Sequence, residues 1–329
     1  MNELELTLAI HDYDHTRDLV TGKVPVQGVR LRTIEFTPPE INGRFARYRE
    51  WEVSEYGLGK YVAQRAAGDD TITAIPVFPA RAFRQSCIYV GADSDLHELE
   101  ELAGRRVGIP EWAQTAVVWV RGLLVHHHGV DLASIDWHQA GVREPGRAEK
   151  VAIALPAGVG LTPHPDRTLE DLLLTGELDA IVTAQPPDAF VAGDPRIRRL
   201  LADPRASEEA YYRATGIFPI MHAIAIRRDV YDAHPWIAAN LMTAFEEAKR
   251  RSYGRLFDGM APRFPMPWIA DAAERAWAIF GDDIYPYGID ANRATLEALV
   301  QYAAEQGVAQ RRLAVEDLFA PTSRESLRL

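Results

Sequence analysis

Short apolar runs alternate with helical segments along the whole chain. The run RRVGI at 105–109 is typical of a strand, and the amphipathic segment that follows it ends at Gly129. The mainly helical part of the chain begins at His234. Such alternation predicts an α/β fold. The other runs that we expect to form strands are 4–10, 29–36, 51–56, 71–78, 87–91, 135–141, 178–188 and 221–230.

The chain is long enough for two lobes. With 329 residues, 47% of them hydrophobic and 25% charged, it can form two α/β lobes, each with its own core and with a cleft between them. We expect the strands at 87–91 and 222–228 to be the two crossings between the lobes. Lobe 1 would then hold residues 1–90 and 222–329, covered by the C-terminal helices, and lobe 2 would hold 91–221.

Charge and composition argue against several classes of partner. The formal net charge is -11 and no segment is rich in Lys or Arg, which argues against nucleic acid and anionic membranes. No window approaches the roughly 18 apolar residues that span a bilayer, and MNELELTLAIHDYD shows no secretory signal. The only cysteine, Cys87, allows no intramolecular disulfide. We expect a cytoplasmic protein that binds a small molecule, and a homo-oligomer is left open.

Residues 74–90, AIPVFPARAFRQSCIYV, place two arginines on a connection between two strand-like runs. Connections at strand ends are where α/β proteins meet their ligands. A guanidinium group can bind a carboxylate through two parallel hydrogen bonds, so Arg81 and Arg84 together could hold a diacid. We predict that they bind an anionic ligand in the cleft, the alternative being two solvated arginines.

Several long segments resemble, in the same order, those of the 4,5-dihydroxyphthalate decarboxylase family. The resemblance runs nearly from end to end and implies the type 2 periplasmic-binding-protein fold, with a cleft between two lobes. It also implies decarboxylation of a hydroxylated aromatic acid without a pyridoxal, thiamine or flavin cofactor, whereas a divalent metal is not excluded. The segments are DYDHTRDL (12–19), VSEYGLGKY (53–61), IPVFPARAFRQSCIYV (75–90), GRRVGIPEWAQTAVVWVRGLL (104–124), GELDAIV (176–182), YYRATGIFPIMH (211–222), HPW (234–236) and YPYG (285–288).

The chemistry implied by the resemblance needs a group that moves protons. His222 is a lone imidazole between apolar runs at a lobe crossing, and imidazoles titrate near neutral pH. Glu55 is flanked by Val53, Tyr56 and Gly57 near a strand end, so partial desolvation could raise its pKa toward acid–base catalysis. The alternatives are a core histidine and a solvent-exposed glutamate at a helix start. We predict catalytic roles for His222 and Glu55 and a substrate contact for Ser54.

The loop after the first strand offers further candidates. Asp12, Tyr13 and Asp14 should face the cleft, where one of them could accept a hydrogen bond from a ring hydroxyl. A turn-and-cap role for DYDHT is the alternative. His11 and His15 bracket this loop, but the segment begins as strand and turn rather than as a helix, so we predict no metal site. We predict a catalytic role for Asp14 and substrate contacts for Asp12 and Tyr13.

The segment after 105–109 adds two substrate-binding candidates. Thr115 and the backbone amides at its helix start could bind a carboxylate, although Thr115 could instead cap the helix. Trp112 could stack on an aromatic ring. Gln85 is a further candidate, on the same connection as the two arginines.

The chain departs from the family pattern in these loops. Relatives commonly have His where it has Gln85, Tyr-Gln where it has Trp112 and Ala113, and Ser where it has Gly57 and Gly59. The loss of these polar groups favours a related ring as much as 4,5-dihydroxyphthalate itself. A solute-binding protein that captures an aromatic carboxylate for transport or sensing is the alternative function.

Overall fold

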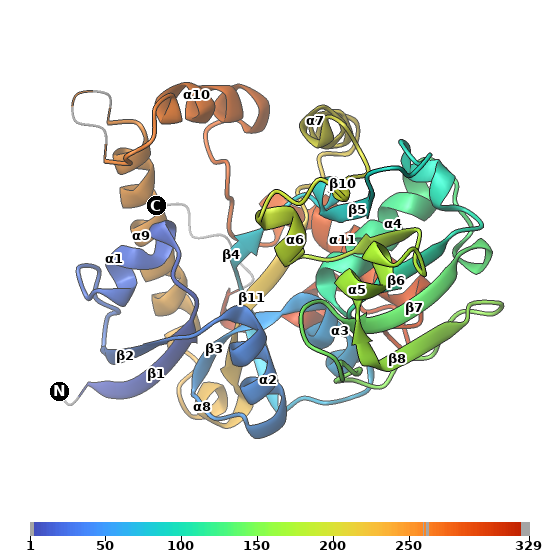
Figure 1. Cartoon of the computed structure of the whole chain (residues 1–329). Helices are drawn as coiled ribbons and strands as arrows, with labels where there is room; N and C mark the ends of the chain where they lie inside the picture. The colour runs from blue at the N-terminus through green and yellow to red at the C-terminus, as the bar shows by residue number, and fades with distance from the viewer. Residues whose placement is uncertain (1–2, 259, 261–262, 324–329) are drawn as a thin grey trace.

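The computed structural model describes residues 3–258, 260 and 263–323. In this part of the chain the strands form two sheets, which lie side by side with helices packed around both (Figure 1). The α/β prediction is confirmed.

The first sheet combines parallel and antiparallel strands. Its strands are β1 (Leu4–Ile10), β2 (Val29–Glu35), β3 (Val53–Gly57), β4 (Ile72–Arg81) and β11 (Ile220–Arg227). Their order is β2-β1-β3-β11-β4. β1 is parallel to both β2 and β3, whereas β11 runs antiparallel between β3 and β4. The sequence-distant β11 therefore lies beside the two strands that lead into the cavity described below.

The second sheet contains the middle of the chain. Its strands are β5 (Ile88–Gly91), β6 (Arg106–Ile109), β7 (Asp136–Gly141), β8 (Leu161–Thr168), β9 (Ala180–Val182) and β10 (Ile197–Arg199). Their order is β10-β5-β9-β6-β7-β8. β6, β7, β8 and β9 pair in parallel, and β5 is antiparallel to β9 and β10.

Helices cover both sheets (Figure 1). The long helix α9 packs against β4 of the first sheet, and α4 is buried along most of its length. Helix α11 packs against both α3 and α4. The helices are α1 (Arg17–Val20), α2 (Pro38–Tyr48), α3 (Leu58–Ala66), α4 (Thr115–His128), α5 (Leu169–Leu174), α6 (Asp188–Val191), α7 (Pro204–Thr215), α8 (Arg228–Ala233), α9 (Ile237–Leu256), α10 (Ile269–Phe280) and α11 (Arg293–Glu305).

The chain passes from the first sheet to the second after β4 and returns through β11. The lobe boundaries that we placed at these points stay a prediction. We expected the C-terminal helices to cover lobe 1, and α9 does lie there. Helix α11 packs against both α3 and α4, with the ring of Tyr302 edge-on to Trp119 of α4 at 5.7 Å between ring centroids.

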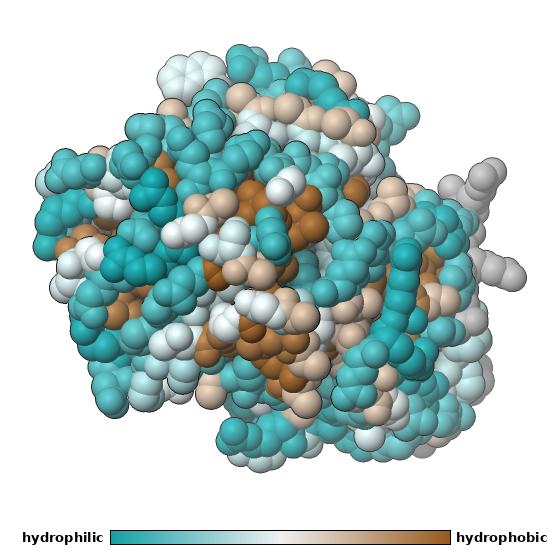
Figure 2. All heavy atoms as spheres, turned by 90° about the vertical axis from the view of Figure 1, so that its right-hand side faces the viewer, coloured by the Kyte–Doolittle hydropathy of each residue, from teal (hydrophilic) through white to brown (hydrophobic). Residues whose placement is uncertain are grey.

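No helix among the described residues is both long and apolar enough to cross a membrane. Hydrophilic side chains dominate the face shown in Figure 2, with hydrophobic groups near its centre.

Candidate active site

A cavity of about 280 Å³ lies between the two sheets, with walls from both. Five of its lining residues are cationic: Lys60, Arg81, Arg84, Arg147 and Lys150. None of the lining residues that the structure describes is acidic, although the chain carries a net charge of -11. Prolines, alanines, Val142 and Met221 supply apolar surface. The cavity therefore suits a small anion with an apolar body.

His222 lies in β11, where the pairing of β11 with the proline-containing strand β4 is irregular. β4 contains Pro76 and Pro79 and lies at the edge of the first sheet, where proline is tolerated because no ladder donor is needed. The register between β11 and β4 shifts on both sides of His222. Bulges of this kind redirect side chains and are common beside active sites.

His222 lines the cavity and belongs to a hydrogen-bonded group whose common acceptor is the carboxylate of Glu55. Its Nδ1 lies 2.5 Å from Oε1 of Glu55, and the hydroxyl of Tyr13 donates to the same oxygen at 2.6 Å. Oε2 of Glu55 accepts from the backbone N–H of His11 at 2.9 Å. Because a carboxylate accepts, Nδ1 of His222 is the donor, and Nε2 is the nitrogen left for a ligand. The sequence-predicted His222, Glu55 and Tyr13 are thus brought together.

The electrostatics of Glu55 differ from our expectation. Burial acts to raise its pKa, but the hydrogen bonds and charge of His222, with those of Tyr13 and His11, outweigh burial and hold the pKa below its ordinary value. Glu55 is therefore an ionised acceptor that orients His222, and the predicted raised pKa is wrong. Burial and the neighbouring Glu55 raise the pKa of Tyr13, so its hydroxyl stays protonated.

Arg81 and Arg84 both line the cavity but have different surroundings. The guanidinium of Arg81 donates to the carbonyls of Phe218 and Pro286 and to the side chain of Asn292, and burial lowers its pKa to about 10. Among the described residues, the guanidinium of Arg84 donates hydrogen bonds only to the sulfur atoms of Met221 and Cys87. Of the two arginines, Arg84 is therefore the one that remains available for an anion.

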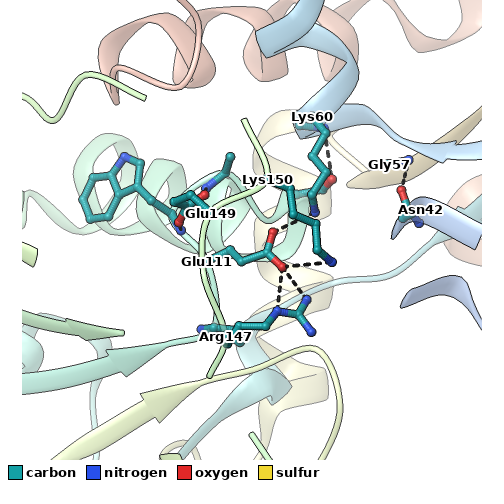
Figure 3. Close-up of polar contacts among 12 residues, drawn as sticks. Asn42, Gly57, Lys60, Glu111, Arg147, Glu149 and Lys150 are labelled. Carbon is teal, nitrogen blue, oxygen red and sulfur yellow. Dashed lines mark hydrogen bonds and ion pairs between the residues drawn. The ribbon is translucent and has the colours of Figure 1, made fainter. Parts of the chain in front are cut away.

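The lining of the cavity also includes a cationic cluster that the sequence analysis missed. The carboxylate of Glu111, which is fully buried, lies 2.9 Å from Nζ of Lys60, 2.5 Å from Nη2 of Arg147 and 3.4 Å from Nζ of Lys150. Figure 3 shows Arg147 and Lys150 turned toward Glu111. Burial acts to raise the pKa of Glu111, but the three cations outweigh it and the pKa is lowered. No sequence motif marks this cluster, because Lys60 lies in α3 and Arg147 lies on the distant connection between β7 and β8.

Two helices begin at the cavity. Gly57 precedes α3 and Thr115 begins α4, and the backbone N–H of Gly59 donates to Oγ1 of Thr115 at 3.0 Å. The Thr115 side chain thus links the two helix starts rather than capping α4. Both helix N-termini direct partial positive charge toward the cavity.

The glycines at these helix starts have a steric reason. A Cβ on Gly57 would lie 2.9 Å from Oδ1 of Asn42, and one on Gly59 would lie 2.8 Å from the carbonyl of Ala113. Asn42 also accepts from the Gly57 N–H (Figure 3). A serine at either position would therefore require these neighbours to move.

Five predicted contacts lie elsewhere and are corrected here. Trp112 is fully buried; its indole N–H donates to the Gln306 carbonyl and its ring stacks under the Arg121 guanidinium, 3.7 Å away, so it cannot stack on a ligand. Asp14 is held by Ser252 and Arg255. The other three do not line the cavity: Asp12 is exposed, Ser54 is buried with its hydroxyl on the Glu55 carbonyl, and Gln85 is buried and accepts from the Arg84 N–H.

Among residues 3–258, 260 and 263–323, no three His, Cys, Asp or Glu side chains gather in a way that could hold a metal ion. His11 is bonded instead to the carbonyl of Phe36.

Sequence comparison finds two similar curated proteins. A 4,5-dihydroxyphthalate decarboxylase of Comamonas testosteroni is 36% identical over 330 residues and is matched over the full length of both chains. A second protein of that name, from Pseudomonas putida, is 38% identical over 215 residues, which cover 65% of this chain and 83% of that protein. No protein-family model matches the chain.

Solved structures share the fold at low sequence identity. The periplasmic sulfonate-binding protein SsuA of Methylobacillus flagellatus KT aligns with a TM-score of 0.55 at 13% identity, over 97% of this chain and 92% of that one. SsuA of Escherichia coli aligns with a TM-score of 0.53, also at 13% identity, over 96% and 97%. A variant of the desulfurization enzyme DszB in complex with biphenyl-2-sulfinic acid gives 0.54 at 13% identity, over 98% and 97%. The two-lobed periplasmic-binding-protein fold is thereby confirmed.

Proposed function

Because the chain belongs to the 4,5-dihydroxyphthalate decarboxylase family, and is therefore a carboxy-lyase, we propose that it decarboxylates 4,5-dihydroxyphthalate or a closely related hydroxylated aromatic diacid. The observation that carries this proposal is the cavity itself. Five cationic side chains and the imidazole of His222 line it, and none of the described lining residues is acidic. The imidazole of His222 is paired with the carboxylate of Glu55, which does not line the cavity.

The ring of such a substrate supplies its own electron sink. In 4,5-dihydroxyphthalate each carboxylate is para to a hydroxyl group, so removal of the hydroxyl proton pushes electron density onto the carbon that bears the carboxylate. That carbon then takes up a proton from water, the bond to the carboxylate carbon breaks, and its electron pair returns to the ring as carbon dioxide leaves. The phenolate oxygen then takes back the proton that was removed from the hydroxyl. The organic product is 3,4-dihydroxybenzoate.

His222 is the group that we assign to proton transfer. Its Nδ1–H is held by the ionised Glu55, which fixes the ring orientation and stabilises the imidazolium that forms when Nε2 accepts the hydroxyl proton. Tyr13 completes the hydrogen bonding of Glu55. Arg84 would stabilise the phenolate oxygen beside His222.

The proposal is tested with purified, metal-stripped protein and a panel of aromatic acids. We expect carbon dioxide release from 4,5-dihydroxyphthalate, no release from phthalate, which lacks hydroxyls, and none from 3,4-dihydroxybenzoate, which lacks the second carboxylate. Release measured with and without added divalent metal also tests the expected independence from cofactors.

The shared fold with sulfonate-binding proteins makes a binding protein the second candidate. Thermal stabilisation by the diacid without carbon dioxide release, with and without metals, would contradict the decarboxylase proposal and favour a binding protein.

A further inference from the structure

We propose that Lys60, Arg147 and Lys150, held around Glu111, form a carboxylate subsite that binds the carboxylate edge of the diacid and thereby directs its hydroxyl edge to His222 and Arg84. The inference rests on the proposed function, because it assigns the orientation of the substrate in that same cavity. We name these four residues the Glu111 cluster.

The two lysines of the Glu111 cluster have N–H donors that Glu111 does not use. Within the described residues Glu111 is the recorded partner of both Nζ atoms that line the cavity, at 2.9 Å for Lys60 and 3.4 Å for Lys150. Each ammonium group carries three N–H donors, so one carboxylate leaves several of them unused. Lys60 and Lys150 can therefore bind a second carboxylate without giving up Glu111.

The positions of these cations are fixed by the fold. Arg147 and Lys150 lie on the connection between β7 and β8, which Glu149 ties down by accepting from the backbone N–H groups of Trp112 and Ala113. Gln139 of β7 donates to the same Glu149 carboxylate at 2.9 Å. The subsite thus rests on a braced loop, which reduces the entropy that a ligand must overcome on binding.

Two groups of cations that line the cavity have different surroundings. Lys60, Arg147 and Lys150 surround Glu111, and the carboxylate of Glu149 also interacts with Glu111 and Lys60, so at least one positive charge is in excess. Beside His222, Arg84 is the available cation and the ionised Glu55 opposes it, while the donors of Arg81 are directed to oxygens of the protein. Two adjacent carboxylates match the Glu111 cluster, and hydroxyls that donate to a base match His222.

The composition of the chain points the same way. Its only lysines are Lys23, Lys60, Lys150 and Lys249, and two of the four line this cavity. A lysine is a compact point charge with rotatable donors, so it can bind an incoming carboxylate while it keeps its ion pair with Glu111.

Calorimetric titration of phthalate and benzoate into the whole protein tests the orientation. Phthalate presents the carboxylate edge alone, and benzoate presents a single carboxylate. In Lys150→Met we expect phthalate to bind about tenfold more weakly and benzoate to change by less than about threefold. Lys150→Arg, which keeps the charge, should recover most of the affinity, and Lys23→Met, at an exposed site, should match the wild type.

The same titration in Arg84→Met gives the opposing test. We expect phthalate affinity to change little, because its carboxylates lie at the Glu111 cluster. Loss of phthalate affinity in Arg84→Met but not in Lys150→Met would overturn the orientation, and so would an equal loss of phthalate and benzoate affinity in Lys150→Met. If Lys150→Met does not fold by circular dichroism, Arg147→Met provides the same comparison.

These outcomes are separate from those of the proposed function. If the wild type releases no carbon dioxide while Lys150→Met still weakens phthalate binding, the proposed decarboxylation is refuted and the proposed subsite stands.

Discussion

At the scale of single residues, the partners of a charged group decide what it can do. Arg81 and Arg84 are close in sequence and both line the cavity. The guanidinium of Arg81 donates hydrogen bonds to other residues of the protein, whereas that of Arg84 is available to a ligand. Glu55 and Glu111 are both fully buried carboxylates, and each is ionised because donors surround it. One orients an imidazole and the other gathers cations.

The two arginines should therefore respond differently to substitution. Arg81→Ala removes hydrogen bonds to Phe218, Pro286 and Asn292, and we expect it to lower the free energy of unfolding by about 2 to 4 kcal/mol. Arg84→Met should cost less than about 1 kcal/mol but lower kcat/KM at least about tenfold. Urea denaturation and steady-state kinetics on both variants check this, and the reverse assignment would contradict it.

His15 should make the protein sensitive to mild acid. Burial lowers its pKa from an ordinary 6.5 to about 4. Between these two pH values the imidazole is therefore protonated in the unfolded chain and neutral in the folded protein. Stability is then full above pH 6.5 and is lost as the pH falls toward 4. Between about pH 7 and pH 5 the wild type should lose about 2 kcal/mol more than His15→Gln in urea denaturation. The exposed His97→Gln should behave like the wild type, and parallel losses in all three proteins would refute the prediction.

Part of the site was predictable from sequence because its residues stand out locally. Tyr13 and Arg84 follow strands, Thr115 begins a helix, and His222 and Glu55 are polar residues within apolar strands. All of them but Glu55 line the cavity. The Glu111 cluster was not predictable, since its members lie on a helix start and two loops that only the packing of two sheets brings together. The prediction for Trp112 failed for a related reason: its indole N–H is bonded to the carbonyl of Gln306, which is distant in sequence.

At the scale of elements, periodicity predicted most strands and helices near the cavity. The edge strand β8 was missed because it carries Pro163 and Pro165 and is largely exposed, so it lacks the apolar pattern of a buried strand. β10 was missed because it has only three residues. Neither strand lines the cavity.

Close packing of α4 on α11 should be intolerant of added volume. A Cβ on Gly122 of α4 would lie 2.1 Å from the Tyr302 ring, so we expect Gly122→Ala to lower the free energy of unfolding by about 1 to 3 kcal/mol. Gly254 of α9 has no atom within 4 Å of the same position, and Gly254→Ala should raise it by about 0.5 to 1 kcal/mol. Equal effects in urea denaturation would refute this account of the α4–α11 contact.

At the scale of the whole molecule, an acidic protein concentrates positive charge in one cavity between its two sheets. Local cations must therefore attract an anion against the overall field, and salt screens such attraction. We expect the Kd of phthalate to rise about fivefold between about 0.02 and 0.5 M NaCl, and that of benzoate to rise less. Calorimetry across this range checks it; a Kd of phthalate independent of salt would contradict the charge-based account.

Oligomeric state and cellular compartment stay predictions.

The central claim is that His222, oriented by Glu55, moves the proton in a decarboxylation within this cavity. The most direct measurement compares carbon dioxide release from 4,5-dihydroxyphthalate by the wild type and His222→Gln, alongside phthalate binding to both. We predict that kcat falls at least about a hundredfold in the variant while the Kd of phthalate stays within about threefold. A variant that releases carbon dioxide at the wild-type rate would contradict the claim.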